Sequence, residues 1–143
     1  MNNILNETEI DSFKKDGAIF LKGKFDISWI EKLQRGIEKD IKNPSPRFKS
    51  HTLEKGVPAY LEDYWTWHLV PEFTDFVFNS PYAKIASELM SAKKINLVMD
   101  NWFLREGGSK SKTPFHQDIS YFDMEGTMSV SYTHLTLPTT PYV

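Results

Sequence analysis

His116, Gln117 and Asp118 form the segment of this sequence with the clearest capacity for chemistry. On an extended strand, side chains two positions apart point to the same side, so His116 and Asp118 can reach one cation together. An imidazole nitrogen and a carboxylate oxygen are two of the three ligands in the facial 2-His-1-carboxylate site. That site holds non-haem Fe(II) and leaves coordination positions open for other ligands. The spacing therefore predicts that His116 and Asp118 are metal ligands.

A His and an Asp two positions apart also occur by chance, so the surrounding residues matter for the interpretation. Gly107 and Gly108 predict a turn shortly before the pair. Apolar or aromatic side chains flank it on both sides, at Phe115, Ile119, Tyr121 and Phe122. The alternative is a surface strand on which His116 and Asp118 are merely solvated. The flanking residues favour the metal site.

Two stretches of the sequence resemble the phytanoyl-CoA dioxygenase family. They are residues 100–108 (DNWFLREGG) and residues 113–122 (TPFHQDISYF). Residues 13–21, followed by Phe25 and Asp26, are similar to the helix, Asp-Gly pair and first strand with which the family opens. The resemblance extends from about residue 10 to about residue 128 and is most specific around His116.

The resemblance implies an Fe(II)- and 2-oxoglutarate-dependent dioxygenase built on a double-stranded β-helix. It implies that His116, Asp118 and a distal His bind Fe(II), while 2-oxoglutarate and O2 take the remaining positions. Gln117 and Arg105 are expected near the cosubstrate, and Tyr121 is expected to line the substrate site. Arg105 could equally be an exposed charge at a strand end, and Tyr121 could simply pack. The expected substrate is an unidentified small organic or lipid-like molecule.

The distal His of the family comes from a remote strand, and the Arg that pairs with 2-oxoglutarate follows it. After Asp118 this sequence contains one His, His134, and no charged residue follows Glu125. Residues 130–140 resemble the translation of an adapter used in preparing sequencing libraries; the alternative is a genuine polar strand. We interpret residues 1–129 as a partial domain and residues 130–143 as a non-native tail. We expect the chain as given to be an inactive fragment.

Composition fits a cytoplasmic enzyme. The 143 residues suit one domain, and 40% hydrophobic with 14% aromatic residues supply a core. The absence of cysteine excludes disulfides, zinc thiolates and a thiol nucleophile. A net charge of -2 gives no electrostatic reason to expect nucleic acid or anionic membrane as a partner. No signal peptide or membrane span is apparent, and nothing indicates the oligomeric state.

The apolar spacing predicts four helices ahead of the sheet. Asn6 with Glu9 three positions later predicts the start of the first helix, which Gly17 ends. A second helix is expected after Asp26, with an inward stripe of Ile30, Leu33, Ile37 and Ile41. Two further helices are expected to begin around Pro71 and Pro81.

Strands are expected mainly near the carboxyl end. Residues 18–21 predict a short buried strand, and residues 95–100 and 102–105 predict two more, before the strand that carries His116. Residues 47–69 are interpreted as a long loop or irregular segment. This order predicts an α+β fold, in which amino-terminal helices buttress an incomplete double-stranded β-helix (jelly-roll or cupin-like) sheet.

Two other functional classes are compatible with the same residues. One is a non-catalytic fragment or interaction module that binds no metal. The other is a cupin-like metal protein with a non-oxygenase function, which would share the barrel and the early ligand pair. Succinate formation coupled to O2 uptake would separate an oxygenase from both.

Overall fold

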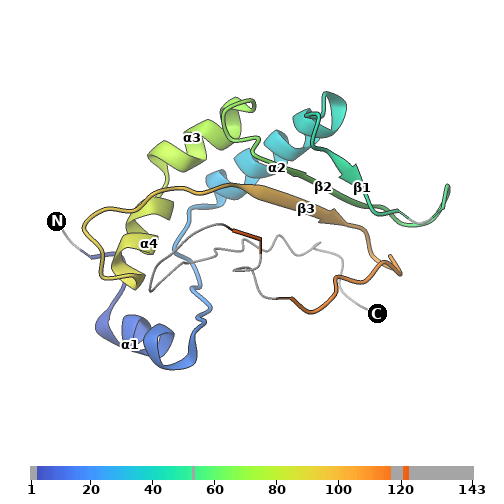
Figure 1. Cartoon of the computed structure of the whole chain (residues 1–143). Coiled ribbons are helices and arrows are strands. Elements are labelled where there is room, and N and C mark those ends of the chain that lie inside the picture. Colours follow the sequence, from blue (N-terminus) through green and yellow to red (C-terminus); the bar gives the residue numbers. More distant parts are fainter. Residues whose placement is uncertain (1–2, 53, 117–120, 123–143) are drawn as a thin grey trace.

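The computed structural model describes residues 3–52, 54–116 and 121–122 (Figure 1). In chain order the elements are α1 (Glu7–Asp16), α2 (Ile27–Lys42), β1 (Lys49–Ser50), β2 (Tyr60–Tyr64), α3 (Pro71–Asn79), α4 (Tyr82–Leu89) and β3 (Asn101–Arg105). The strands form one antiparallel sheet in the order β1-β2-β3. The fold is therefore α+β, as the sequence predicts.

Helix α1 begins and ends at the predicted residues. The Asn6 side chain accepts a hydrogen bond from the Glu9 N–H at 2.9 Å, and the Glu9 carboxylate accepts one from the Asn6 N–H at 2.9 Å. These two bonds satisfy donors that the first helical turn leaves without a partner. Gly17 then takes a left-handed conformation with φ 73°, which costs glycine little.

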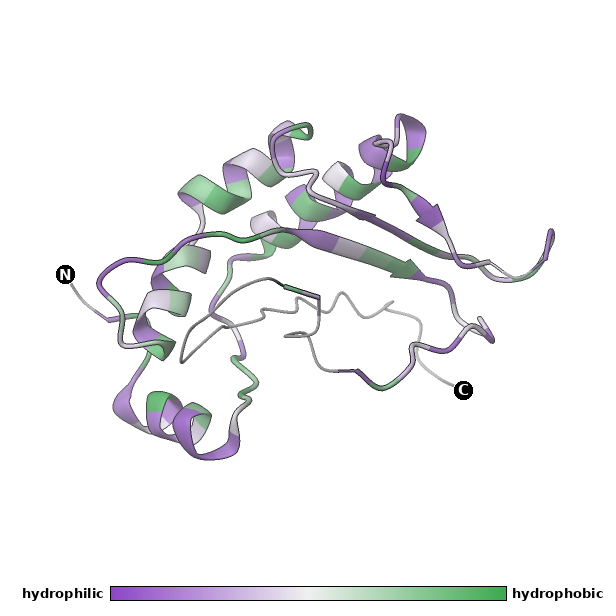
Figure 2. Ribbon diagram, viewed as in Figure 1, coloured by the Kyte–Doolittle hydropathy of each residue, from purple (hydrophilic) through white to green (hydrophobic). Residues whose placement is uncertain are grey.

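Helices α2 and α3 pack together and cover one face of the sheet (Figure 1). Their contact is close, because a Cβ built on Gly36 of α2 would lie 2.4 Å from Cε1 of Phe73 in α3. Figure 2 shows hydrophobic and hydrophilic residues interleaved along α2, as expected of a helix with one buried side. The core between these layers contains Leu33, Ile37, Ile41, Leu61, Val70, Phe73, Trp102 and Leu104.

A second, smaller core joins the amino-terminal segment to α4. Leu5, Ile85 and Leu89 are its buried members, and Ile10 and Phe13 of α1 pack against them. The carboxylate of Glu88 accepts hydrogen bonds from the backbone N–H groups of Ile4 and Leu5, the latter at 2.7 Å. Residues ahead of α1 are thereby fixed to α4 at the end of the molecule away from β1.

The expectation of an irregular segment over residues 47–69 is wrong, because β1 and β2 lie within it. In β2, Leu61 opposes Leu104 and Asp63 opposes Trp102 of β3. The sequence does not predict this strand, because Glu62 and Asp63 are adjacent acidic residues and such residues are uncommon in strands. Asp63 is nevertheless completely buried, and it accepts hydrogen bonds from the N–H and hydroxyl of Ser45 at 2.9 and 2.7 Å.

Two predicted strands, residues 18–21 and residues 95–100, are not strands in the structure. Ile19 and Leu21 pack on the α4 core, but Phe20 is 83% exposed and no ladder forms there. The second segment lacks a partner, because β2 pairs fully with Asn101–Arg105 and the chain then turns at Trp65, whose φ is 56°. At this end of the β2–β3 ladder, a bond from the Trp65 N–H to the Asp100 carbonyl at 3.0 Å continues the pairing by one residue.

No strand is present among residues 106–116 either, so the structure does not bear out a strand leading into His116. Gly107 and Gly108 do form the predicted turn, with φ 85° at Gly108. Beyond it, Pro114 has no N–H to give to a ladder. This segment is held to the sheet by side chains, which are described next.

Candidate metal site

His116 lies on the surface, at the end of the segment that follows β3. Its Nδ1 is 2.8 Å from the carbonyl oxygen of Pro114. A carbonyl oxygen can only accept a hydrogen bond, so this contact places a proton on Nδ1 and leaves Nε2 as the nitrogen that could bind a metal. Metal-ligating histidines commonly have one ring nitrogen oriented in this way by a backbone carbonyl. The local geometry of His116 therefore suits ligation through Nε2.

Tyr121 lies beside His116. The two ring centroids are 5.7 Å apart and the planes are nearly perpendicular, at 85°. The Tyr121 side chain is 70% exposed, so the ring covers one side of the imidazole without enclosing it. The structure thus brings together the predicted ligand and the predicted substrate-site residue.

Gln117 and Asp118 lie outside the described residues, so their predicted roles beside His116 stay predictions. Within the described ranges, no group of three or more His, Asp or Glu side chains is arranged to hold a metal ion. His116 is the one predicted metal ligand whose surroundings can be stated.

Arg105 is the last residue of β3, and its guanidinium binds the segment that follows the strand. It donates hydrogen bonds to the carbonyl oxygens of Ser109 and Ser111. Its Cζ also lies 5.3 Å from the centre of the Tyr60 ring, within the range of a cation–π contact. The guanidinium therefore helps to fasten the chain between β3 and His116, whatever it binds in addition.

Tyr60 is a functional candidate that the sequence did not connect with His116. It is the first residue of β2 and is 8% exposed, and its hydroxyl is 3.0 Å from the Thr113 hydroxyl. Thr113 lies three positions before His116. The available signal was the alternation of Tyr60, Glu62 and Tyr64, which would have placed these three side chains on one face of a strand.

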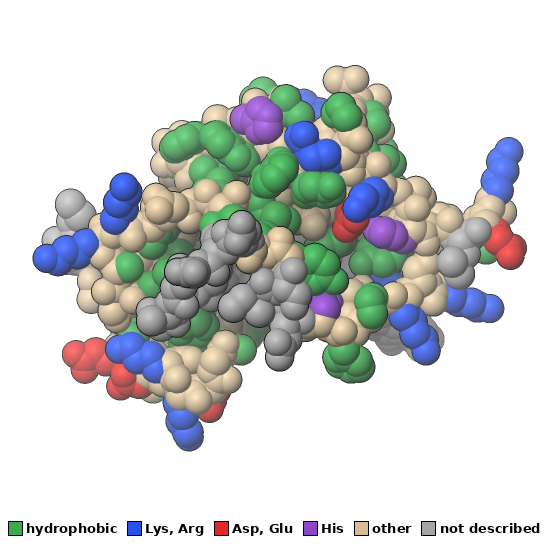
Figure 3. Space-filling view, viewed as in Figure 1, with side chains coloured by type: hydrophobic (Ala, Val, Ile, Leu, Met, Phe, Trp, Pro, Cys, Tyr) green, Lys and Arg blue, Asp and Glu red, His purple; other side chains and the backbone are tan. Residues whose placement is uncertain are grey.

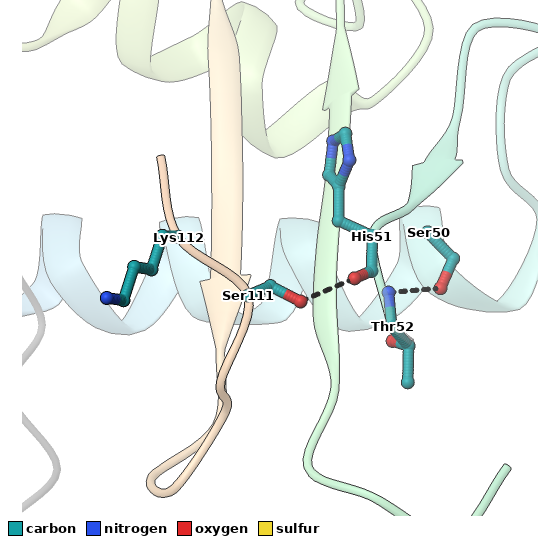
Figure 4. Close-up of a pocket in the computed structure, with 5 residues that line it drawn as sticks. All are labelled: Ser50, His51, Thr52, Ser111 and Lys112. Carbon is teal, nitrogen blue, oxygen red and sulfur yellow. Dashed lines mark hydrogen bonds between the residues drawn. The ribbon is translucent and has the colours of Figure 1, made fainter. Parts of the chain in front are cut away.

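A surface pocket lies beside this fastening point, between the end of β1 and the segment after β3 (Figure 4). The Ser111 hydroxyl donates to the His51 carbonyl at 2.6 Å, while His51 Nε2 is 3.0 Å from a Glu62 carboxylate oxygen. In Figure 4 the Lys112 side chain points away from His51. The polar groups of this pocket thus mainly join β1 to the segment that leads to His116.

Three carboxylates form a network beneath the sheet. Asp40 of α2, 3% exposed, accepts a hydrogen bond from Trp102 Nε1 at 2.8 Å. Burial raises the pKa of Asp40, the Trp102 bond opposes this, and the nearby carboxylates of Asp63 and Asp100 raise it further. Asp100 in turn accepts bonds from the N–H and hydroxyl of Thr66. These acids join α2 to β2 and β3, and we assign them to the fold rather than to the metal site.

On the face shown in Figure 3, the Lys and Arg side chains do not gather into a basic patch that would bind a polyanion such as nucleic acid. Lys and Arg side chains are dispersed over that face and around its outline, and hydrophobic side chains occupy much of its upper part. No helix among the described residues is long and apolar enough to cross a membrane.

Comparisons with known proteins add no relative. No family model matches the sequence, and no curated protein or solved structure matches it.

Proposed function

We propose that this chain carries part of the active site of an Fe(II)- and 2-oxoglutarate-dependent dioxygenase that hydroxylates a small organic or lipid-like substrate. The observation that carries the proposal is the contact between His116 Nδ1 and the Pro114 carbonyl at 2.8 Å. It supports ligation because it leaves Nε2 as the nitrogen with the lone pair, in a residue that the His-x-Asp spacing had already selected.

The donor set fits iron. Imidazole nitrogen and carboxylate oxygen, without thiolate, are the ligands of non-haem Fe(II) oxygenases. His116 Nε2 and the Asp118 carboxylate would hold the metal on one side. Bound Fe(II) and 2-oxoglutarate would supply the oxidising power that places one oxygen atom of O2 in a substrate C–H bond, with release of succinate and CO2.

The remaining proposed roles concern orientation. Gln117 and Arg105 would contact 2-oxoglutarate, and Arg105 offers a permanent positive charge for a carboxylate. That role would draw on guanidinium N–H groups beyond those given to the Ser109 and Ser111 carbonyls. Tyr121, whose ring stands against His116, would present an apolar edge to the substrate. A double-stranded β-helix around these residues is part of the same proposal.

We also propose that the 143-residue chain binds Fe(II) weakly and does not turn over substrate. Two protein ligands hold a divalent ion less firmly than three, and His134, in the adapter-like stretch, is a poor third ligand. The expected behaviour is metal binding without catalysis. Succinate formation coupled to O2 uptake by this chain would contradict the expectation of inactivity, although it would support the assigned chemistry.

An anaerobic titration with Fe(II) and 2-oxoglutarate tests the proposal. The chelate of Fe(II) by 2-oxoglutarate absorbs visible light when a protein site holds it. We expect the wild-type chain to show this absorption and to approach saturation only at high Fe(II) concentration. His116→Ala and Asp118→Ala should each weaken metal binding by more than about tenfold, because each removes a ligand.

His68→Ala is the matched control for removing an imidazole, since His68 is exposed and its ring contacts Trp67 instead. It should leave the titration unchanged. If all four proteins titrate alike, the metal site is not at His116 and Asp118, and the proposed function fails.

A further inference from the structure

We infer that Tyr60 is a positioning residue for the metal ligand His116. This inference rests on the proposed function and deepens it, because it assigns a role to a side chain that does not itself reach the metal. It starts from the hydroxyl contact of 3.0 Å between Tyr60 and Thr113.

Tyr60 is firmly held. Its carbonyl accepts a hydrogen bond from the His51 N–H at 2.7 Å, and its own N–H donates to the Thr52 hydroxyl at 3.2 Å. Its ring lies against His51, Phe103 and Arg105, with centroid distances of 5.0 and 6.3 Å to the two rings and 5.3 Å to the guanidinium carbon. A side chain restrained on so many sides presents its hydroxyl at a defined point.

That point controls the backbone just before His116. Thr113 precedes a proline, which restricts the backbone of Thr113 to extended conformations, and the Pro114 ring fixes its own φ near -65°. Few rotations therefore separate the Thr113 side chain from the Pro114 carbonyl. Fixing Thr113 on Tyr60 directs that carbonyl, and the carbonyl in turn orients the His116 ring through Nδ1.

Thr113, Pro114 and His116 are all exposed, so burial does not restrain this segment. The Ser111 contact with the His51 carbonyl fixes the chain earlier, ahead of Thr113. The Tyr60–Thr113 hydrogen bond joins this segment to β2 at a point three residues before His116. The Tyr60 hydroxyl contacts Thr113, whereas the Tyr60 ring packs against Phe103 and Arg105 of β3.

The test separates the hydroxyl from the ring. Tyr60→Phe and Thr113→Val each remove one partner of the contact, Thr113→Ser keeps a hydroxyl, and Tyr64→Phe removes a hydroxyl from the same strand. Affinity for Co2+, measured by its visible absorption, and the nitrogen-15 shifts of the His116 ring, which report its tautomer, are the two readouts.

We expect Tyr60→Phe and Thr113→Val to weaken Co2+ binding about threefold to fivefold each, the scale of one hydrogen bond. The double variant should be no worse than either single one, since both remove the same contact. Thr113→Ser and Tyr64→Phe should match wild type. Nitrogen-15 shifts in the two weakened variants should move toward a mixture of tautomers, a change that general loss of stability would not produce.

Two outcomes would overturn the inference in different ways. If His116→Ala abolishes Co2+ binding while Tyr60→Phe matches wild type in affinity and in tautomer, His116 is a ligand and Tyr60 does not position it. If wild type and His116→Ala bind Co2+ equally, the proposed function fails and the positioning role fails with it.

Discussion

At the scale of single residues, a histidine is prepared as a ligand when one ring nitrogen is protonated and directed to an acceptor. In this protein the acceptor is the Pro114 carbonyl, two residues before His116 along the chain. The spacing in the sequence predicts that His116 is a ligand, and this stays a prediction, but the sequence could not predict the tautomer. That property depends on the local backbone path, which Pro114 and the contact at Thr113 restrict.

The buried acid Asp40 makes stability depend on pH. Its folded-state pKa is raised above the ordinary value of 3.8, chiefly by burial and further by Asp63 and Asp100. The folded state therefore binds this proton more tightly than the unfolded state does. As pH rises from about 3.8 through the raised folded-state pKa, the Asp40 contribution to the free energy of unfolding falls.

Asp40→Asn should remove this contribution while keeping an oxygen that accepts the bond from Trp102 Nε1. We expect its free energy of unfolding to fall less than that of wild type as pH rises from about 4 to 7. Urea denaturation at a series of pH values measures the difference between the two proteins. Asp11→Asn, on the exposed side of α1, controls for the loss of one negative charge. Parallel pH profiles for wild type and Asp40→Asn would contradict the argument.

At the scale of secondary-structure elements, the α2–α3 contact depends on one glycine. Alanine at position 36 would gain about 1 kcal/mol of helix propensity. Its Cβ would lie 2.4 Å from Phe73 Cε1, however, and overpacking of this kind costs about 1–3 kcal/mol. We expect Gly36→Ala to lower the free energy of unfolding by about 1 kcal/mol, as measured by urea denaturation.

Replacing Phe73 by a smaller side chain separates the clash between helices from a general effect of alanine on α2. In a Phe73→Leu background, Gly36→Ala should cost less than in wild type, because leucine lacks Cε1, the ring atom nearest to the added Cβ. Equal costs in the two backgrounds would show that the ring contact is not responsible.

The helices were predictable from the sequence because their signals are local. Asn6 and Glu9 lie within one turn, and the apolar stripe of α2 repeats every three to four residues. Strands depend on a partner elsewhere in the chain, and here prediction succeeded only in part. Residues 102–105 were predicted as a strand and lie in β3, whereas β1 and β2 were not predicted. Residues 95–100 alternate as a strand should, yet β2 is already paired with Asn101–Arg105.

The predicted site divides in the same way. His116 and Tyr121 were identified from a short motif and a family resemblance, and the structure brings their rings together. The contact of Tyr60 with Thr113 was missed, because the two residues are 53 positions apart in the sequence. Such a contact exists only after β2 and β3 have paired and the turn at Gly108 has brought the chain back.

At the scale of the whole molecule, the sheet is small and partly open. Among the described residues β3 pairs with β2 alone, and Phe103 on β3 is 55% exposed. Strand edges without partners readily pair with other chains. A three-stranded sheet of this kind, packed on helices along one face, is expected to give the isolated chain only marginal stability.

We therefore expect thermal unfolding of the 143-residue chain to be broad and to change with protein concentration. Circular dichroism at several concentrations, with light scattering to detect association, measures this directly. A single cooperative transition at the same temperature over a hundredfold range of concentration would contradict the expectation, and would show that the open edge does not associate.

The central claim, that His116 is a metal ligand through Nε2, is tested most directly by NMR of the four histidine rings. Nitrogen-15 correlation spectra of the imidazoles should show His116 with its proton on Nδ1 in the absence of metal. Small additions of Mn2+ should then broaden the His116 signals before those of His51 and His68. A His116 ring protonated on Nε2, or broadening that spares it, would contradict the account.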